Sequence, residues 1–191
     1  MTSADRIKWE EAHRGKGAGG APEPFLIEML PLLQRGGLVL DVAAGRGRNA
    51  IALARAGMRV VAADFSAGAM DALSEFGRAQ HLPIWPVIAD LDNFACRDRS
   101  FDAIVNTNFL DRALFPKFAR ALNPGGILLA ETFLIDQAEI GHPRDPRFLL
   151  KHHELRELLG DLELMRYREG LVVYPDGSCA WRAGAVARRK D

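Results

Sequence analysis

Three aspartates lie where three short apolar runs end, a spacing typical of a ligand site. Asp41 lies near the end of the first run, Asp64 ends the second, and Asp90 follows the third. If these runs are neighbouring parallel strands, their carboxyl ends meet at one edge of a sheet, where open α/β sheets bind ligands. Carboxylates accept hydrogen bonds and attract positive charge. The three residues therefore predict a site for a ligand that carries a positive charge and hydrogen-bond donors.

A glycine-bearing loop follows the first run. The segment from Gly45 to Ala50 fits the G-x-G-x-x-A pattern of dinucleotide-binding loops. Asp64 follows Gly47 by 17 residues, near the ~20 that this pattern gives for a ribose-binding acid. Such glycines let the backbone approach a ligand, although a tight strand–helix turn that binds nothing has the same pattern. Asp41 would crowd a pyrophosphate, so it disfavours a dinucleotide whose phosphates lie on this loop.

The elements that must position these residues alternate between strand and helix from Gly37 onward. Apolar runs separated by helical segments indicate a parallel sheet covered on both faces. Residues 175–178 (Pro-Asp-Gly-Ser) predict a hairpin turn between two further strands. The other predicted strands are 38–42, 59–63, 84–89, 101–106 and 127–133, and the predicted helices are 4–14, 23–30, 49–55, 66–80, 111–122 and 152–159. This order predicts an α/β fold with a doubly wound, mostly parallel seven-stranded sheet and a C-terminal antiparallel hairpin.

Composition and charge exclude several classes of protein. The 191 residues predict a single domain, and 25 Lys+Arg balance 25 Asp+Glu, so no nucleic-acid partner is expected. No apolar stretch approaches the ~18 residues that span a bilayer and no signal peptide is visible, so no membrane partner is expected either. Cys96 and Cys179 lie far apart, which predicts no disulfide or zinc site and a reducing cytoplasm. His152 and His153 are adjacent and are expected at a solvated helix end rather than at a metal.

On these motifs the chain resembles the class I S-adenosylmethionine-dependent methyltransferases, over residues 37–134 and, through the hairpin, over most of its length. Residues 101–106 look like the fourth motif of that superfamily, and residues 122–126 look like the turn before its fifth strand. The resemblance implies a Rossmann-like fold, S-adenosyl-L-methionine as the cofactor, and transfer of its methyl group to a small-molecule acceptor. Residues 45–49 and the segment around Trp9 look most like small bacterial tellurite-resistance and thiopurine methyltransferases.

The resemblance also implies roles for single residues. The loop from Asp41 to Gly47 would wrap the methionine part of the cofactor, and Asp64 would bind the ribose hydroxyls. The implied cofactor-binding residues are Asp41, Ala43, Gly45, Gly47, Asp64, Phe65 beside the adenine, Asp90 at its amino group, Leu91 through its backbone, and Asn106 at the cofactor ammonium. The sequence departs from the family at Ala43, which replaces the first glycine of the usual D-x-G-x-G loop. A methyl group is small enough for binding to survive, but the loop must then sit slightly differently.

The reaction asks little of the side chains. Methyl transfer from a sulfonium is an in-line displacement whose leaving group needs no protonation, and orientation alone can supply ~7–11 kcal/mol. No catalytic residue and no metal ligand is therefore assigned. Residues after the fourth predicted strand would shape the substrate pocket, namely Asn108, Phe109 and Arg112. For Phe109, packing in the core is the competing interpretation.

Three functions remain open on the sequence. The first is a methyltransferase for a small molecule, and the second is a nicotinamide-dependent oxidoreductase that uses the glycine loop. The third is a cofactor-binding module without catalysis that acts through a partner. The expected parts are N-terminal helices and a lid over 1–36, with 9–22 mobile until a ligand binds, a cofactor-binding core over 37–134, and a last helix with the hairpin over 135–191.

Overall fold

The computed structural model describes residues 10–11, 15, 17–93, 95–174 and 176–190. The first predicted helix, 4–14, lies outside the described residues except for Glu10 and Glu11, which are helical. Trp9 and part of the predicted lid also lie outside them.

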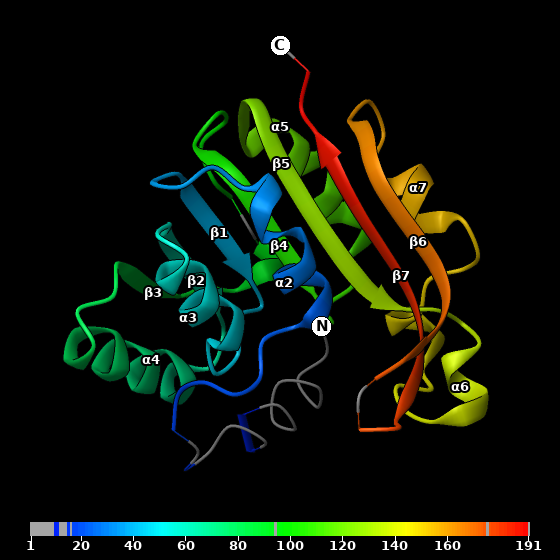
Figure 1. The fold of residues 1–191 in the computed structure, drawn as a ribbon, viewed down its shortest axis with the longest axis horizontal. Coiled ribbons are helices and arrows are strands. Elements are labelled where there is room, and N and C mark those ends of the chain that lie inside the picture. The colour runs from blue at the N-terminus through cyan, green and yellow to red at the C-terminus, as the bar shows by residue number, and fades with distance from the viewer. Residues whose placement is uncertain (1–9, 12–14, 16, 94, 175, 191) are drawn as a thin grey trace.

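A single sheet forms the centre of the described part of the chain, with seven strands in the order β3-β2-β1-β4-β5-β7-β6 (Figure 1). The strands are β1 (Leu38–Val42), β2 (Arg59–Asp64), β3 (Ile84–Ile88), β4 (Phe101–Thr107), β5 (Leu122–Phe133), β6 (Glu163–Val173) and β7 (Cys179–Arg188). β1 to β5 pair in parallel, and β7 pairs antiparallel with both β5 and β6. The predicted sheet and its C-terminal hairpin are confirmed.

Helices cover both faces of this sheet (Figure 1). The helices are α2 (Pro24–Met29), α3 (Arg48–Arg55), α4 (Ala67–Ala79), α5 (Phe115–Ala121), α6 (Gln137–Ile140) and α7 (Glu154–Leu158), with 3₁₀ turns at Leu30–Leu32, Leu91–Asn93, Arg112–Leu114 and Pro146–Phe148. α2, α3 and α4 pack on what we call the α3 face, against residues such as Val39 and Val105. α5 and α7 pack on the α5 face, against residues such as Leu40 and Ile104. Within the described residues, no helix is both long and apolar enough to cross a bilayer.

Alternation along each strand sorts side chains between the two faces. Val39 lies on the α3 face and Leu40 on the α5 face, so Asp41 returns to the α3 face. Both sides of β1 are buried, which explains why its sequence is almost entirely apolar. The carboxyl ends of the five parallel strands meet at what we call the carboxyl edge, at the bottom of Figure 1.

Two predicted helices begin later than expected. The helix predicted over 111–122 begins as α5 only at Phe115, because Asp111 first caps a 3₁₀ turn by accepting a hydrogen bond from the Ala113 N–H at 2.9 Å. Pro116 lies in the first turn of α5, where its missing N–H leaves no bond unmade. The last helix begins at Glu154 rather than 152, since His153 has a left-handed φ of 64°.

The turn predicted at 123–126 lies inside β5 instead of before it. Phe101 pairs with Leu122 and Ala103 with Ile127, so one residue of β4 faces four residues of β5 that bulge out of the ladder. Gly125 has a φ of 74° there. These residues form the expected turn, but β5 pairs with β4 both before the turn, at Leu122, and after it, from Ile127 onward.

Candidate cofactor site

The predicted acids meet at the carboxyl edge. β1, β2 and β3 are parallel neighbours, so Asp41, Asp64 and Asp90 all lie toward the same edge of the sheet. Asp41 on β1 pairs in register with Ala62 on β2, and Asp64 lies two residues after Ala62 on β2. Asp41 and Asp64 therefore share the α3 face, where the glycine loop passes from β1 into α3.

The loop that follows β1 runs through left-handed backbone. Ala43, Gly45 and Gly47 have φ values of 52°, 51° and 76°. Ala43 thus adopts the conformation that glycine adopts freely, at a cost of about 1–2 kcal/mol for a residue with a Cβ.

Packing against α4 explains why position 47 is a glycine. A Cβ at Gly47 would lie 2.4 Å from Cδ1 of Leu73, which is fully buried. Gly47 also provides the first turn of α3 with its N-terminal boundary. Its lack of a side chain lets α4 approach the loop closely, so this glycine is required whether or not a ligand is bound.

Asp64 fastens the loop to the end of β2. Its Oδ2 accepts a hydrogen bond from the Gly45 N–H at 2.8 Å, and its Oδ1 accepts one from the Ser66 N–H at 2.9 Å. The helix cap of α4 is Ser66, whose Oγ accepts from the Ala69 N–H at 3.3 Å, as predicted. Each carboxylate oxygen has a second lone pair, so Asp64 can still accept hydrogen bonds from ribose hydroxyls.

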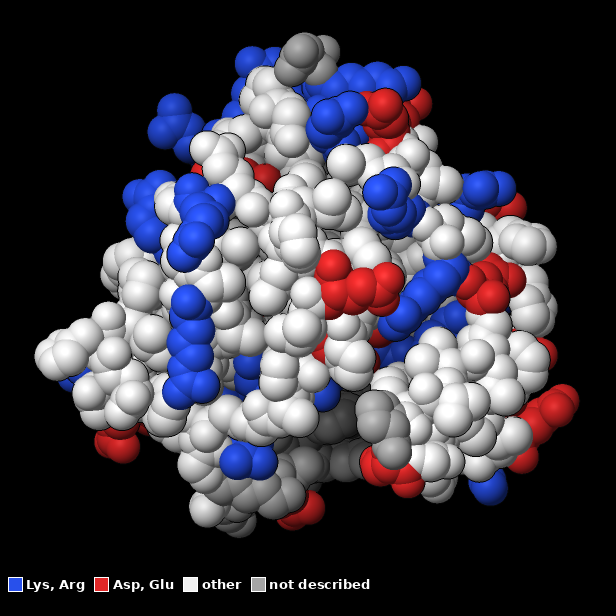
Figure 2. Space-filling view, in the orientation of Figure 1, with Lys and Arg blue, Asp and Glu red and all other residues white. Residues whose placement is uncertain are grey.

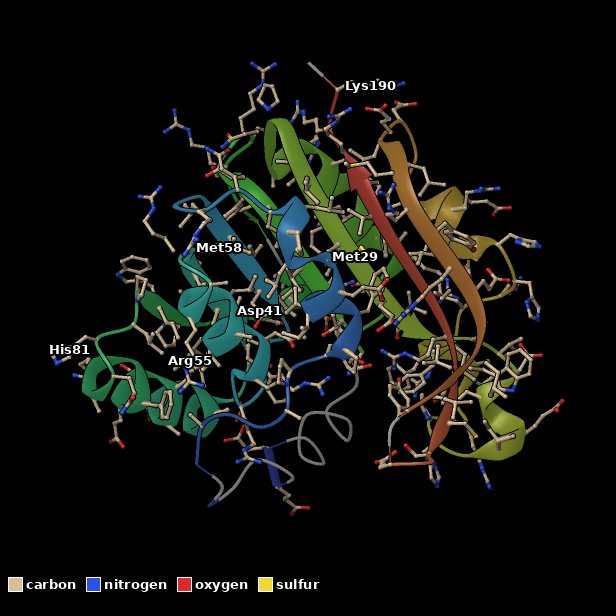
Figure 3. The ribbon with its side chains drawn as sticks, in the orientation of Figure 1. Met29, Asp41, Arg55, Met58, His81 and Lys190 are labelled. Atoms are coloured by element: carbon tan, nitrogen blue, oxygen red, sulfur yellow. The ribbon has the colours of Figure 1, made fainter. Side chains whose placement is uncertain are left out.

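Asp41 is buried at the end of β1, in the interior of the molecule (Figure 3). Burial raises the pKa of its carboxyl to about 7; the Ala50 N–H and the charge of Arg48 lower it, and the charge of Asp64 raises it. Its Oδ2 has no hydrogen-bond partner among the described residues. A buried acceptor without a donor is costly, and a cationic N–H donor such as an ammonium group would satisfy it. The residue therefore fits a positively charged ligand.

Two of the three residues expected around the adenine, Asp90 and Leu91, lie in a compact turn after β3. Asp90 Oδ1 accepts from the Asp92 N–H at 3.1 Å and Oδ2 accepts from Asn93 Nδ2 at 3.2 Å. Leu91 is buried beside it, and Phe65 is half-buried after β2. Their roles toward adenine stay predictions.

Asn106 does not lie beside Asp41. It pairs in register with Val42, which places it on the α5 face. Its Nδ2 donates to the Phe109 carbonyl at 3.3 Å, and its buried Oδ1 has no partner within the described part of the chain. Phe109 is half-buried and packs against the apolar cluster of the α5 face, as the core interpretation expects.

Arg112 is held in a structural clamp. Its Nε lies 2.6 Å from Glu154 Oε1 and its Nη2 lies 2.9 Å from Oε2, a bidentate pair that lowers the pKa of Glu154. Nη2 also donates to the Leu149 carbonyl at 2.9 Å. The guanidinium therefore joins the turn after β4 to α7, and its predicted place in a substrate pocket gains no support from these contacts.

A buried charge network lies beside the acids, and sequence reasoning missed it. Glu131 on β5 is 0% and Arg182 on β7 is 2% exposed, and Arg182 Nη2 lies 3.0 Å from Glu131 Oε2. Arg168 on β6 reaches the same carboxylate, with Nη2 2.5 Å from Oε1. Gly184 stands between Glu131 and Arg168 in the sheet, and the Phe25 ring packs over it, since a Cβ there would lie 3.0 Å from Phe25 Cε1. The sequence does carry one sign of this network, which is the charged residue Glu131 within the largely apolar strand β5.

Glu23 and Asn108 complete this network from outside the sheet. Glu23 Oε2 lies 2.6 Å from Arg48 Nη2 and accepts from Asn108 Nδ2 at 3.0 Å. Asn108 Oδ1 in turn accepts from Arg182 Nη1 at 2.6 Å. Asn108 is therefore held in a polar cluster after β4, which is where the sequence placed the substrate side of the site.

His152 is not simply solvated. Its Nε2 lies 2.9 Å from Asp136 Oδ2 and its Nδ1 lies 2.9 Å from Glu169 Oε1. The hydrogen bond to Glu169 and the charge of Asp136 raise the pKa of His152. Among the described residues, no group of histidines, cysteines and carboxylates is arranged to hold a metal ion.

Comparisons with known proteins agree with this geometry. Residues 39–126 match the family described as "Methyltransferase domain". "Hemagglutinin 1" of Eikenella corrodens is 30% identical over 139 residues, which is 69% of this chain and 46% of that protein. A demethylmenaquinone methyltransferase of Corynebacterium urealyticum is 38% identical over 106 residues, 53% of this chain and 44% of that protein. The chain thus spans a little under half the length of the curated relatives it matches.

Solved structures show the same fold. TehB from Haemophilus influenzae has a TM-score of 0.76 to this chain at 22% identity, over 88% of this chain and 62% of TehB. At this identity the likeness concerns the fold. Residues 39–126 match a methyltransferase domain, and the chain shares its fold with TehB and with a solved S-adenosylmethionine-dependent methyltransferase of Methanosarcina mazei.

Proposed function

We propose that this protein transfers the methyl group of S-adenosylmethionine to a small-molecule acceptor. The observation that carries the proposal is the pair of buried acids Asp41 and Asp64 on one face of the carboxyl edge, beside a left-handed glycine loop. The unpartnered Oδ2 of Asp41 suits a cationic donor, and the free lone pairs of Asp64 suit paired hydroxyls. S-adenosylmethionine carries both an ammonium group and a ribose.

The chain's own residues would bind and orient rather than exchange protons. Bound S-adenosylmethionine supplies an electrophilic methyl group on a sulfonium. Asp64 would hold the ribose, the loop 43–47 would enclose the methionine part, and Asp41 would balance its ammonium group. No side chain is asked to protonate a leaving group, so alignment of the acceptor with the methyl group is the main task.

A segment before α2 lies across the glycine loop and would help to exclude water. Residues 17–22 run along the carboxyl edge (Figure 1). Arg46 Nε donates to the Gly17 carbonyl at 2.6 Å, and the Gly19 N–H donates to the Arg46 carbonyl at 2.7 Å. These contacts support the proposal that residues 9–22 act as a lid over the cofactor.

The two other functions that the sequence left open are disfavoured. A nicotinamide dinucleotide would bring its pyrophosphate to a loop that already lies against Asp41, a buried carboxyl. The match of residues 39–126 to a methyltransferase domain also favours catalysis over a module that only binds the cofactor. Detection of methyl transfer to any acceptor would distinguish a methyltransferase from a module that only binds the cofactor.

A small molecule is proposed as the partner, rather than nucleic acid or a membrane. On the face drawn in Figure 2, basic and acidic side chains are interspersed instead of forming one basic surface. The net charge of zero supports the same proposal. Cys96 and Cys179 are free thiols, which supports the proposed reducing, cytoplasmic location.

The experiment is a transfer assay with methyl-labelled S-adenosylmethionine against fractionated metabolite pools. The proposal expects label in at least one small-molecule fraction, together with formation of S-adenosylhomocysteine. The Asp64→Asn variant serves as the matched control and should transfer far less. Label that enters only RNA, DNA or protein would contradict the proposed acceptor class.

A further inference from the structure

The glutamate that precedes α2 is buried for a reason other than helix capping. The Glu23 side chain is only 5% exposed, and it makes no capping hydrogen bond to α2 although it occupies the N-cap position. A carboxylate is costly to bury unless it is paired and hydrogen-bonded. Its position therefore depends on the groups that it meets across the carboxyl edge.

Glu23 meets three different parts of the site. Its carboxylate pairs with Arg48 at the start of α3, accepts from Asn108 after β4, and lies 3.5 Å from Arg182 Nη2 on β7. Its backbone N–H donates to Asn49 Oδ1 at 2.9 Å, and Asn49 Nδ2 donates to Thr107 Oγ1 at 2.8 Å. One residue thus joins the segment before α2, the helix that carries the glycine loop, and the end of β4.

Asn108 is the contact that links Glu23 to the loop after β4. It has a left-handed φ of 57°, a conformation that asparagine adopts more readily than other residues with a Cβ. Glu23 accepts from its Nδ2 and Arg182 Nη1 donates to its Oδ1, so the two charges fix the orientation of the amide. The Asn108 N–H also donates to the Glu131 carbonyl at 2.9 Å.

We propose that Glu23 is a positioning residue for methyl transfer, which acts through Asn108 to fix the loop after β4 on the acceptor side of the cofactor. The inference rests on the proposed function, because that loop borders the acceptor only if the cofactor lies over Asp41 and Asp64. Glu23 touches neither reactant in this account. Glu23 instead determines the position of Asn108 and of the loop residues that follow Asn108.

The test compares Glu23→Gln with Glu28→Gln as a matched control. Glu28 lies in α2, five residues after Glu23, and is also paired with an arginine, at 3.3 Å from Arg168 Nη1, but it is 60% exposed and, within the described residues, forms no hydrogen bond with Asn108. The readouts are the side-chain amide resonances of Asn108, assigned by their loss in Asn108→Asp, and amide exchange over residues 106–110. Exchange within α4 serves as the internal reference, and S-adenosylhomocysteine affinity is measured on each variant.

Glu23→Gln should shift the Asn108 side-chain resonances and speed exchange over 106–110 by up to about tenfold relative to α4, because the charged acceptor becomes a neutral amide oxygen. S-adenosylhomocysteine affinity should stay within about twofold of the parent, since the cofactor contacts are elsewhere. Glu28→Gln should change none of these. Unmoved Asn108 resonances with unchanged loop exchange would overturn the proposal, as would equal effects in both variants.

A second variant covers the case in which Glu23→Gln does not fold. Asn108→Asp keeps the shape of the side chain and its tolerance of the left-handed backbone, and it replaces the Nδ2 donor that Glu23 accepts from with an oxygen. It should speed exchange over 106–110 as Glu23→Gln does, and exchange equal to the parent would overturn the role of Asn108. Failure of the parent protein to bind S-adenosylhomocysteine would instead contradict the proposed function, so the two failures are distinct.

Discussion

Asp64 at the end of β2 accepts a hydrogen bond from the backbone N–H of Gly45 at 2.8 Å, so one carboxylate holds the loop that follows the neighbouring strand. Its other oxygen accepts from the Ser66 N–H at the start of α4. The same side chain that is proposed to bind the cofactor ribose therefore also organises the loop around it. Binding and local stability are coupled at this residue.

This coupling sets the expected result of Asp64→Ala. On the sequence alone the change should weaken cofactor binding and leave the fold nearly unaffected, since Ser66 is the helix cap. In the structure, the backbone N–H groups of Gly45 and Ser66 donate to Asp64 and would lose their acceptor. The free energy of unfolding should therefore also fall by about 1–3 kcal/mol. Affinity for S-adenosylhomocysteine should fall ~10–150-fold. Calorimetry and urea unfolding on one preparation measure both.

Asp64→Asn should be intermediate in both respects, because the amide keeps one acceptor and loses the charge. Asp71→Asn, at an exposed position of α4, is the matched control and should alter neither quantity. A destabilised Asp64→Ala protein that still binds at the parent's affinity would contradict the ribose role and leave only the structural one.

Asp41 should make the ligand-free protein less stable as pH rises. Burial raises the pKa of its carboxyl to about 7, so the folded state holds a proton that the unfolded state has already released. Stability from this group is complete below the ordinary pKa and is lost as pH rises through about 7, on the order of 4 kcal/mol at most. Asp41→Asn should remove this slope, which urea unfolding at about pH 5 and pH 8 would measure.

The same substitution should weaken binding of S-adenosylhomocysteine by about tenfold or more, because a charged acceptor for the ammonium is lost. A variant that is more stable at high pH yet binds less well is the expected combination. An unchanged pH slope in Asp41→Asn would show that another group titrates in this window.

Gly47→Ala separates packing from backbone strain. Gly47 has a φ of 76° and faces Leu73, whereas Gly125 has a φ of 74° and nothing within 4 Å of its added Cβ. Gly125→Ala should therefore cost about 1–2 kcal/mol from backbone strain alone. Gly47→Ala should cost a further ~1–3 kcal/mol from overpacking. Chemical unfolding measures both, and equal losses would contradict the close approach of α4 to the loop.

His152 should stabilise the protein more at low pH than at high pH. The hydrogen bond to Glu169 and the charge of Asp136 raise its pKa, so its contribution is complete below the ordinary value of ~6.5 and is lost as pH rises through the folded-state pKa. His152→Asn should lower the melting temperature at about pH 5.5 more than at about pH 8.5. His81→Asn, in the exposed turn that follows α4 (Figure 3), is the control. An equal loss at both pH values would exclude a charged His152 as the cause.

The sequence predicts the elements of this fold well where hydrophobic pattern and turn residues agree. β1 has its predicted bounds, and Ser66 caps α4 as expected, because both follow from local composition. The helix after β4 begins four residues later than the sequence predicts, since Asp111 can cap either a helix or a 3₁₀ turn and here caps the turn. The bulge at 123–126 depends on pairing with β4, which local sequence does not specify.

The candidate site divides in the same way. Asp41, Asp64 and the glycine loop follow from position along the chain, and the structure brings them together. The partners of Glu131 and Arg182 follow only from strand register, because β5 and β7 are separated by about fifty residues in sequence. The sequence predicts Arg112 in the substrate pocket, but in the structure Arg112 is paired with Glu154. Glu154 is distant in sequence, so the tertiary fold alone brings it close to Arg112.

Calorimetric titration of the protein with S-adenosylmethionine, S-adenosylhomocysteine and NAD in parallel is the sharpest test of the proposed cofactor site. We expect both adenosyl ligands to bind at one site, with affinity reduced in Asp64→Asn and Asp41→Asn, and we expect no binding of NAD. Binding of NAD with no response to either adenosyl ligand would contradict the proposed site.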